Sequence, residues 1–317
     1  MPGPEQPAAA AAARFARAGA VLGCLGLGSS LFVVMRLLET WHVSPAPRSH
    51  HISVLGQPLS YPTANFAAVA VLVLALLGLT VTAVAIAGMA REVAAARRFA
   101  RSLPAIGHMN DVVVLSDDRP RAFCAGLLRP RVYVSSGAVA TLDGEALNAV
   151  LLHERHHAQR RDPLRLACGR VAARALFFIP GLSDLVDRQQ ALAELSADET
   201  AMNAAPENRS ALARAMLGFY DGARPGDPVG IDPARIDHVL GETPAWRFPV
   251  VLSLLALAVI AVLVGLGIVF GAAAHGSASL APPLLSSRPC VMALAAIPGL
   301  VTLVSLRLRS VTPLRNG

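Results

Sequence analysis

Three long apolar runs constrain the fold of this 317-residue chain more than any other feature. They occupy residues 18–38, 65–90 and 248–274. A helix of about 20 residues crosses a hydrocarbon core of about 30 Å, and each run is long enough to do so. Between the second and third runs the chain is charged and resembles a soluble domain. We therefore expect an α-helical membrane protein with an inserted soluble domain.

A fourth apolar run, residues 289–306, is shorter and contains Pro298 and Gly299. These two residues are compatible with a kinked or interfacial segment. We expect the run to span the membrane, because an even number of crossings agrees better with the distribution of arginine. The sequence thus predicts four transmembrane helices.

Arginine placement orients these helices, since the cytoplasmic flanks of membrane segments carry excess positive charge. Arginines precede the first run and follow the second and fourth: Arg14, Arg17, Arg91, Arg97, Arg98, Arg101, Arg307, Arg309 and Arg315. The loop over residues 39–63 has only Arg48, and residues 276–288 have only Arg288. Both termini and the middle domain are therefore predicted to face the cytoplasm, in a multi-pass protein of the cell membrane.

The chain is basic, with a formal net charge of +7 and an isoelectric point near 10.2. Such a charge suits either nucleic acid or an anionic surface. The chain has no lysine, so its strongly basic residues are all arginines, and many of them lie beside the apolar runs. Anionic lipid accounts for that placement better. We expect the lipid bilayer as a partner and no direct binding of nucleic acid.

The pentapeptide His153-Glu154-Arg155-His156-His157 carries the chemistry of the middle domain. Residues four apart share one face of a helix, so His153 and His157 can both bind one tetrahedral Zn²⁺. Zinc lowers the pKa of a bound water from ~16 to ~7, and Glu154 can take the proton as a general base. Asp143 has the character of an N-cap for this helix. His156 belongs to another face, and we expect it to take no part.

A catalytic zinc normally has three protein ligands, so a third must lie downstream. Residues 183–204 have the spacing of a second helix, on which Glu194 and Asp198 share a face. We expect Glu194 to bind the zinc, with Asp198 accepting a hydrogen bond from the far nitrogen of a zinc-bound histidine. Taken alone, both carboxylates are more typical of a solvated helix surface, and the interpretation as a ligand depends on the upstream histidine motif.

Asp162 precedes Pro163 and therefore has the signature of an N-cap followed by proline at the first helical position. The structural interpretation is favoured. Asp162 could also brace the zinc helix from the second shell of residues around the metal, and the sequence leaves both roles open.

Short valine-rich segments at residues 111–115 and 131–134 read as strands, with a third at residues 122–125. An edge strand beside the zinc helix could hold an extended peptide by backbone hydrogen bonds. Phe123, Cys124, Ala125 and Gly126 are the candidates for this substrate-binding strand. The alternative is that these residues are simply core strands.

The motifs resemble those of the gluzincin membrane peptidases, above all the β-lactam-sensing receptor and methicillin-resistance sensor peptidases, and more distantly the HtpX-like proteases. The resemblance covers residues 91–245 and includes the segment 123–134, the stretch 177–180, Asp162, and Glu194 with Asp198. It implies an inserted α+β gluzincin-like domain that acts as a zinc endopeptidase, with one Zn²⁺ per chain held by His153, His157 and Glu194. The sequence stops at Gly317, soon after the last apolar run, so we expect no penicillin-binding sensor domain.

A further cationic or hydrogen-bonding group usually helps to stabilise the oxyanion. The candidates are Arg235, His238 and Tyr220. The segment 235–240 resembles an arginine-containing helix of these peptidases, which favours Arg235 slightly. In the receptor relatives, proteolysis relieves repression by a winged-helix transcriptional repressor. The resemblance therefore implies a protein substrate, and such a repressor is a reasonable candidate.

The expected organisation has five parts: a tail (1–17), two transmembrane helices with an extracytoplasmic loop (18–90), a cytoplasmic metallopeptidase domain (91–247), two transmembrane helices (248–306) and a cytoplasmic tail (307–317). Two alternatives to regulated proteolysis stay open. One is a membrane-protein quality-control protease. The other is a non-catalytic membrane adaptor or signal transducer with a structural zinc site, for which the spacing of Cys168 is compatible with a fourth ligand.

Overall fold

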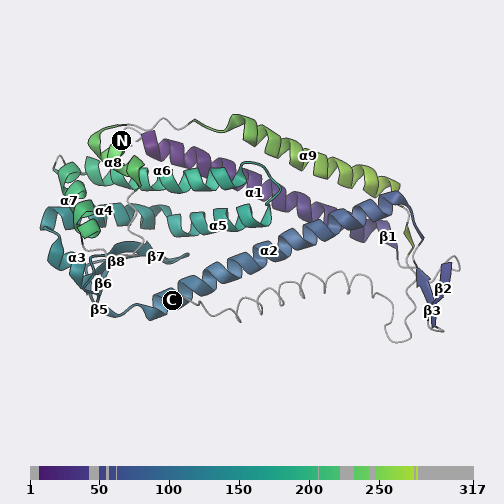
Figure 1. Cartoon of the computed structure of the whole chain (residues 1–317), viewed down its shortest axis with the longest axis horizontal. Coiled ribbons are helices and arrows are strands. Elements are labelled where there is room, and N and C mark those ends of the chain that lie inside the picture. The colour runs from purple at the N-terminus through teal and green to yellow at the C-terminus, as the bar shows by residue number, and fades with distance from the viewer. Residues whose placement is uncertain are drawn as a thin grey trace. The chain divides into compact units, whose positions relative to one another are not determined.

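The computed structural model describes residues 7–42, 50–54, 57–61, 63–205, 207–221, 232–242, 247–274 and 276–277. Within these residues the chain is mostly helical (Figure 1). The helices are α1 (Pro7–Thr40), α2 (Phe66–Ser102), α3 (Ser136–Thr141), α4 (Gly144–Arg160), α5 (Asp162–Ala175), α6 (Leu182–Asn203), α7 (Asn208–Asp221), α8 (Pro233–Leu240) and α9 (Val250–Ala273). The chain divides into two compact units. Unit 1 comprises residues 1–20, 89–170 and 183–250, and unit 2 comprises residues 21–88, 171–182 and 251–317.

Three of the described helices are long and apolar enough to cross a membrane: Ala8–Glu39 of α1, Phe66–Ser102 and Val250–Ala273. The predicted fourth segment, residues 289–306, lies outside the described residues, as does the predicted tail 307–317. The first helix is longer than predicted. Residues 7–17, expected to belong to a tail, are helical. Their run of alanines explains this difference, because alanine has the highest helix propensity.

Unit 2 contains the apolar stretches of α1, α2 and α9. Val33 and Leu37 of α1 pack with Val71 and Ala75 of α2 in one buried cluster. The two helices approach closely at Gly78, where a Cβ atom would lie 2.5 Å from the carbonyl oxygen of Ser30. Small strands complete this unit: β1 (Trp41–His42), β4 (Thr63–Ala64) and β9 (Gly276–Ser277) in one sheet, and β2 (His50–Val54) with β3 (Gln57–Tyr61) in another.

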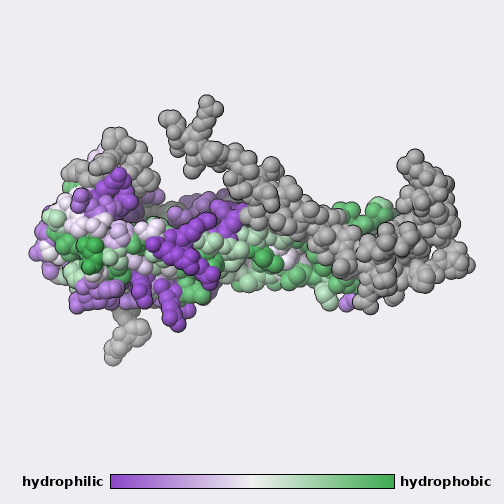
Figure 2. Space-filling model, turned by 90° about the horizontal axis from the view of Figure 1, so that it is seen from below, coloured by the Kyte–Doolittle hydropathy of each residue, from purple (hydrophilic) through white to green (hydrophobic). Residues whose placement is uncertain are grey.

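The two units differ in the character of their surfaces (Figure 2). Purple and green residues mix over unit 1, whereas green predominates on unit 2 where grey atoms do not cover it. Large apolar side chains are exposed along α9, including Val251, Leu254, Val262 and Val269. Apolar side chains facing outward are ordinary for a helix in lipid, where burial from water does not require protein contacts.

Unit 1 contains a four-stranded mixed sheet in the order β5-β6-β8-β7. Its strands are β5 (Ala105–Met109), β6 (Val112–Leu115), β7 (Ala122–Ala125) and β8 (Arg131–Ser135). The parallel pair β6 and β8 lies at the centre, and both edge pairs are antiparallel. Val112, Val132 and Val134 cover Leu151 of α4 and Ala138 of α3 in one buried cluster. This core fixes α4 against the sheet.

Candidate metal centre

Helix α4 carries the histidine motif, and its ends are well defined by local interactions. The Asp143 side chain accepts a hydrogen bond from the Ala146 N–H at 2.7 Å, which confirms the predicted N-cap. The helix ends at Arg160, and its C-cap residue Arg161 has the left-handed conformation with φ 55°. All three histidines of the motif are buried. Their burial is informative because buried polar groups require partners.

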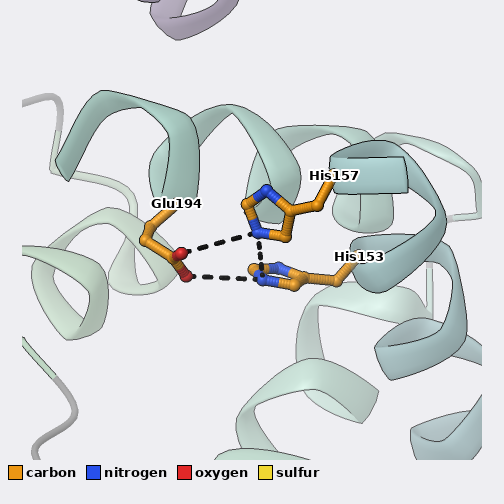
Figure 3. Close-up of side chains that lie close together, drawn as sticks. All are labelled: His153, His157 and Glu194. Carbon is orange, nitrogen blue, oxygen red and sulfur yellow. Dashed lines mark hydrogen bonds and ion pairs between the residues drawn. The ribbon is translucent and has the colours of Figure 1, made fainter. Parts of the chain in front are cut away.

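His153, His157 and Glu194 converge on one point (Figure 3). The Nε2 atoms of the two imidazoles are 3.2 Å apart. Glu194 comes from α6, and its Oε2 lies 3.5 Å from His153 Nε2 while its Oε1 lies 3.5 Å from His157 Nε2. Figure 3 shows the carboxylate facing both rings. Two helices thus bring together two nitrogen donors and one oxygen donor.

The other nitrogen of each ring meets a carboxylate. His153 Nδ1 lies 2.8 Å from Asp198 Oδ1, and His157 Nδ1 lies 2.9 Å from Asp162 Oδ2. A carboxylate accepts a hydrogen bond from the N–H at Nδ1, which leaves Nε2 of each ring directed at the cluster. Asp162 is the first residue of α5 rather than the residue before it. Its carboxylate contacts His157 of α4. Bracing that helix is one of the two roles that the sequence left open for Asp162.

The spacing of the three donor atoms fits a tetrahedral metal ion. Ligands about 2.0–2.1 Å from a zinc ion lie about 3.3 Å from one another at tetrahedral angles. The three distances of 3.2, 3.5 and 3.5 Å agree with that edge length. Three ligands leave a fourth position for water or substrate, which is typical of catalytic rather than structural zinc. Cys168 does not belong to the cluster.

The ionisable side chains of the cluster shift one another's pKa values. Burial alone would lower the pKa of His153, but its hydrogen bonds to Asp198 and Glu194 outweigh burial and raise it to about 9. Burial alone would raise the pKa of Glu194, yet the bond from His153 and the nearby positive charges lower it to about 2. The opposite directions of these two shifts show that the imidazole of His153 and the carboxylate of Glu194 attract each other strongly.

Glu154 lies beside this cluster in a cavity of about 410 Å³. The three cluster residues line the same cavity, together with Asp162 and Arg235. Burial raises the pKa of Glu154, because a charged carboxylate is disfavoured away from water. A general base works best when its pKa approaches the working pH, so this shift suits a carboxylate that must take a proton.

Arg235, His238 and Tyr220 were the candidates for stabilising the oxyanion, and Arg235 alone of the three lines the cavity. It donates from Nε and Nη2 to the two oxygens of Asp198 at 2.8 Å, and its Nη1 lies 3.2 Å from Glu194 Oε2. His238 is buried, with Nε2 3.8 Å from Glu199 Oε1, and Tyr220 is exposed. Arg235 thus links two of the acidic residues, a contact that the sequence did not predict.

Strand β7 forms one wall of the cavity through Ala122, Phe123 and Cys124. Ala125 and Gly126 line a neighbouring hollow instead. Among the described strands, β7 is paired with β8 only and is an edge of its sheet. The predicted strand over residues 122–125 is confirmed. Strand β7 lies against α4, and its other edge is paired with none of the described strands.

Helix α7 forms a further wall of the cavity, a role that no motif in the sequence indicated. Leu212, Ala215, Met216 and Phe219 line the cavity. Their spacing of three, four and seven residues is the signature of one helix face and could have indicated this role.

His156 was expected to take no part, but it joins α4 to α6. Its Nε2 lies 3.0 Å from Ser196 Oγ, and its Nδ1 lies 2.9 Å from Thr200 Oγ1. Thr200 donates its own hydrogen to the Ser196 carbonyl, so it accepts from Nδ1 and Ser196 donates to Nε2. Burial lowers the pKa of His156 to about 4, and the neutral ring that these bonds require is therefore favoured.

Asp198→Asn is expected to weaken metal binding by about 10–100-fold, because a partner that orients a metal-bound histidine has effects of this size. Zinc titration of the purified protein with a competing chelator measures the change. The matched control is Asp187→Asn, since Asp187 lies exposed on the same helix α6. Equal affinities for the two variants would contradict a positioning role for Asp198.

The chain also matches a known protein family. Residues 44–236 match the protein-family model described as BlaR1 peptidase M56. The matched range contains strand β7, the histidine motif, Glu194, Asp198 and Arg235. No curated protein matches the chain.

Proposed function

Because the chain belongs to the BlaR1 peptidase M56 family, we propose that it is a zinc endopeptidase that cuts a protein at the cytoplasmic face of the membrane. Membership in the family makes the chain a membrane-associated metallopeptidase, and therefore a hydrolase that acts on protein. The single observation that supports the finer assignment is the convergence of His153, His157 and Glu194 beside Glu154 in one open cavity.

We assign the metal to His153, His157 and Glu194, and we identify it as Zn²⁺, one per chain. Two imidazoles and a carboxylate with a free fourth position are the ligand set of catalytic zinc in peptidases. Asp198 and Asp162 hold the two rings through Nδ1 at 2.8 and 2.9 Å. When bound, zinc polarises the scissile carbonyl and increases the acidity of water.

Glu154 is the proposed general base. Its carboxylate takes a proton from the attacking water and passes it to the amine that leaves when the peptide bond breaks. Arg235 contributes a fixed positive charge at the same cavity. Because its Nε and Nη2 are held by Asp198, Nη1 is the group left nearest to Glu194 and the cavity. We propose that it stabilises negative charge developing on the carbonyl oxygen.

A chelator tests the proposed chemistry most directly. The full chain, purified in detergent, is expected to contain about one zinc and to cut an unfolded protein substrate. Removal of the ion with a chelator should abolish cleavage, and added Zn²⁺ should restore it while Mg²⁺ should not, because Mg²⁺ requires octahedral oxygen ligands. Cleavage that persists in the metal-free protein would contradict the proposal.

We further propose that residues 91–247 form the cytoplasmic peptidase domain of a multi-pass protein of the cell membrane. The arginines that flank the apolar runs support this orientation. A cysteine-reactive reagent that cannot cross the membrane should label exposed Cys168 in inverted vesicles but not in intact cells. Equal labelling of Cys168 in intact cells would place the domain on the other side.

A winged-helix transcriptional repressor is the proposed substrate, as the family relationship suggests. Such a repressor is expected to be cleaved in cells that carry the wild-type chain. It should remain intact in cells with Glu154→Gln, and cleavage in both would assign it to another protease.

A further inference from the structure

A second hollow of about 290 Å³ lies beside the metal cavity in unit 1. Its walls come from α2, from α5 and from the end of β7. Pro163 and Leu166 of α5 line both spaces, so the two are neighbours. The second hollow contains none of the proposed metal ligands.

The lining of this hollow is mostly apolar. Ala95, Ala96 and Phe99 come from α2, and Leu127 and Leu166 face them. Glu92 and Arg170 are the charged residues in the wall, and they pair with each other, with Arg170 Nη2 3.1 Å from Glu92 Oε2. The pair leaves no net charge in the wall. An apolar group is therefore the complementary occupant.

The free edge of β7 extends from the metal cavity to the second hollow. The Ser135 N–H donates to the Arg121 carbonyl at 2.9 Å, so the backbone groups of Arg121 face β8. Backbone groups alternate in direction along an antiparallel strand, which turns the N–H and C=O of Ala122 and Cys124 away from β8. Those groups are suited to bind an added strand.

An extended peptide on this edge would reach both spaces at once. It advances about 3.3 Å per residue. A peptide residue opposite Cys124 would lie at the metal cavity. A residue two or three positions further along the peptide would lie about 7–10 Å from it, next to Gly126 and Leu127 of the second hollow. The strand therefore relates the scissile bond to the second hollow by a fixed number of residues.

We propose that this second hollow is a specificity subsite for a large apolar side chain of the polypeptide substrate, two or three residues from the scissile bond. The proposal rests on the peptidase function above and adds the class of sequence that the enzyme selects. A branched aliphatic or aromatic side chain entering between Ala96, Phe99 and Leu166 would anchor the peptide along β7.

Peptide profiling tests the subsite. The zinc-loaded full chain in lipid nanodiscs is incubated with a mixture of peptides of varied sequence, and the products are identified by mass spectrometry. Wild type is expected to favour large apolar residues at one position, two or three residues from the cut. Ala96→Trp fills the hollow and is expected to reduce the ratio of kcat/KM for a leucine peptide over its glycine counterpart by about tenfold or more. Ala94→Trp is the matched control, because Ala94 is exposed on the same helix and does not line the hollow.

The outcomes separate the subsite from the function on which it rests. Each ratio compares two peptides cut by one variant, so cleavage of the glycine peptide shows that the variant is folded and loaded. If Ala96→Trp is inactive on both peptides, Phe99→Ala takes its place and should shift the preference toward larger side chains. Cleavage with no positional preference, or identical profiles in all variants, overturns the subsite alone. Absence of any cleavage by wild type overturns the peptidase function as well.

Discussion

Glu154→Gln is expected to lower kcat by about 10²–10⁴-fold, the usual contribution of a general acid or base. Glutamine has nearly the same shape as glutamate but cannot take a proton. Glu154 is not one of the three converging donor atoms, so the variant should retain about one zinc per chain. Cleavage of a fluorescent peptide or an unfolded protein, with metal content measured by mass spectrometry, checks both parts.

The control for this variant is Glu145→Gln. Glu145 lies exposed on the same helix α4, and its ion pair with Arg214 at 2.8 Å is a surface pair of small energetic weight. Its kcat should stay near that of wild type. If Glu154→Gln cleaves as fast as this control, the proposed base is wrong and the hypothesis of a structural zinc adaptor is favoured.

Glu194→Ala is expected to reduce zinc affinity by more than about 100-fold, because residues that merely orient metal ligands account for losses of about 10–100-fold. Activity should fall with the bound metal. The change removes the only oxygen donor of the converging set, and it also leaves Arg235 Nη1 without its contact at 3.2 Å. Zinc content after dialysis against a weak chelator is the direct measurement.

Asp187→Asn serves again as the reference, being an exposed acidic residue of α6. A circular dichroism spectrum like that of wild type would show that Glu194→Ala remains folded. Full zinc retention by a folded Glu194→Ala protein would mean that another residue supplies the third ligand.

Local patterns in the sequence predicted much of what surrounds the site. The N-cap at Asp143, the helix near residues 183–204 and the strand at residues 122–125 are confirmed. Each depends on neighbours within a few positions along the chain, where propensity and periodicity act. The spacing of His153 and His157 on α4, and of Glu194 and Asp198 on α6, is of the same kind.

Several contacts between distant segments were not predicted, although the approach of Glu194 and Asp198 to the histidines was expected. Arg235 reaches Asp198 across 37 positions, and His156 reaches Thr200 across 44. Glu199 accepts hydrogen bonds from the Ala8 N–H at 3.2 Å, 191 positions away, at the start of α1. Such pairs depend on how helices pack, and a single sequence contains no periodic signal for them. For this reason the sequence favoured Arg235 only slightly over Tyr220 and His238, although only Arg235 of the three lines the cavity.

The hydrogen bonds of His156 bear on which ions the protein can accept. They tie α4 to α6 through Ser196 and Thr200 without any help from a metal. The distance between the histidines and Glu194 is therefore set by the polypeptide. A large ion such as Ca²⁺, which takes 6–8 oxygen ligands at about 2.3–2.6 Å, would have to stretch two cross-linked helices apart. The proposed zinc site would therefore discriminate among metal ions through the packing of the helices that hold its ligands.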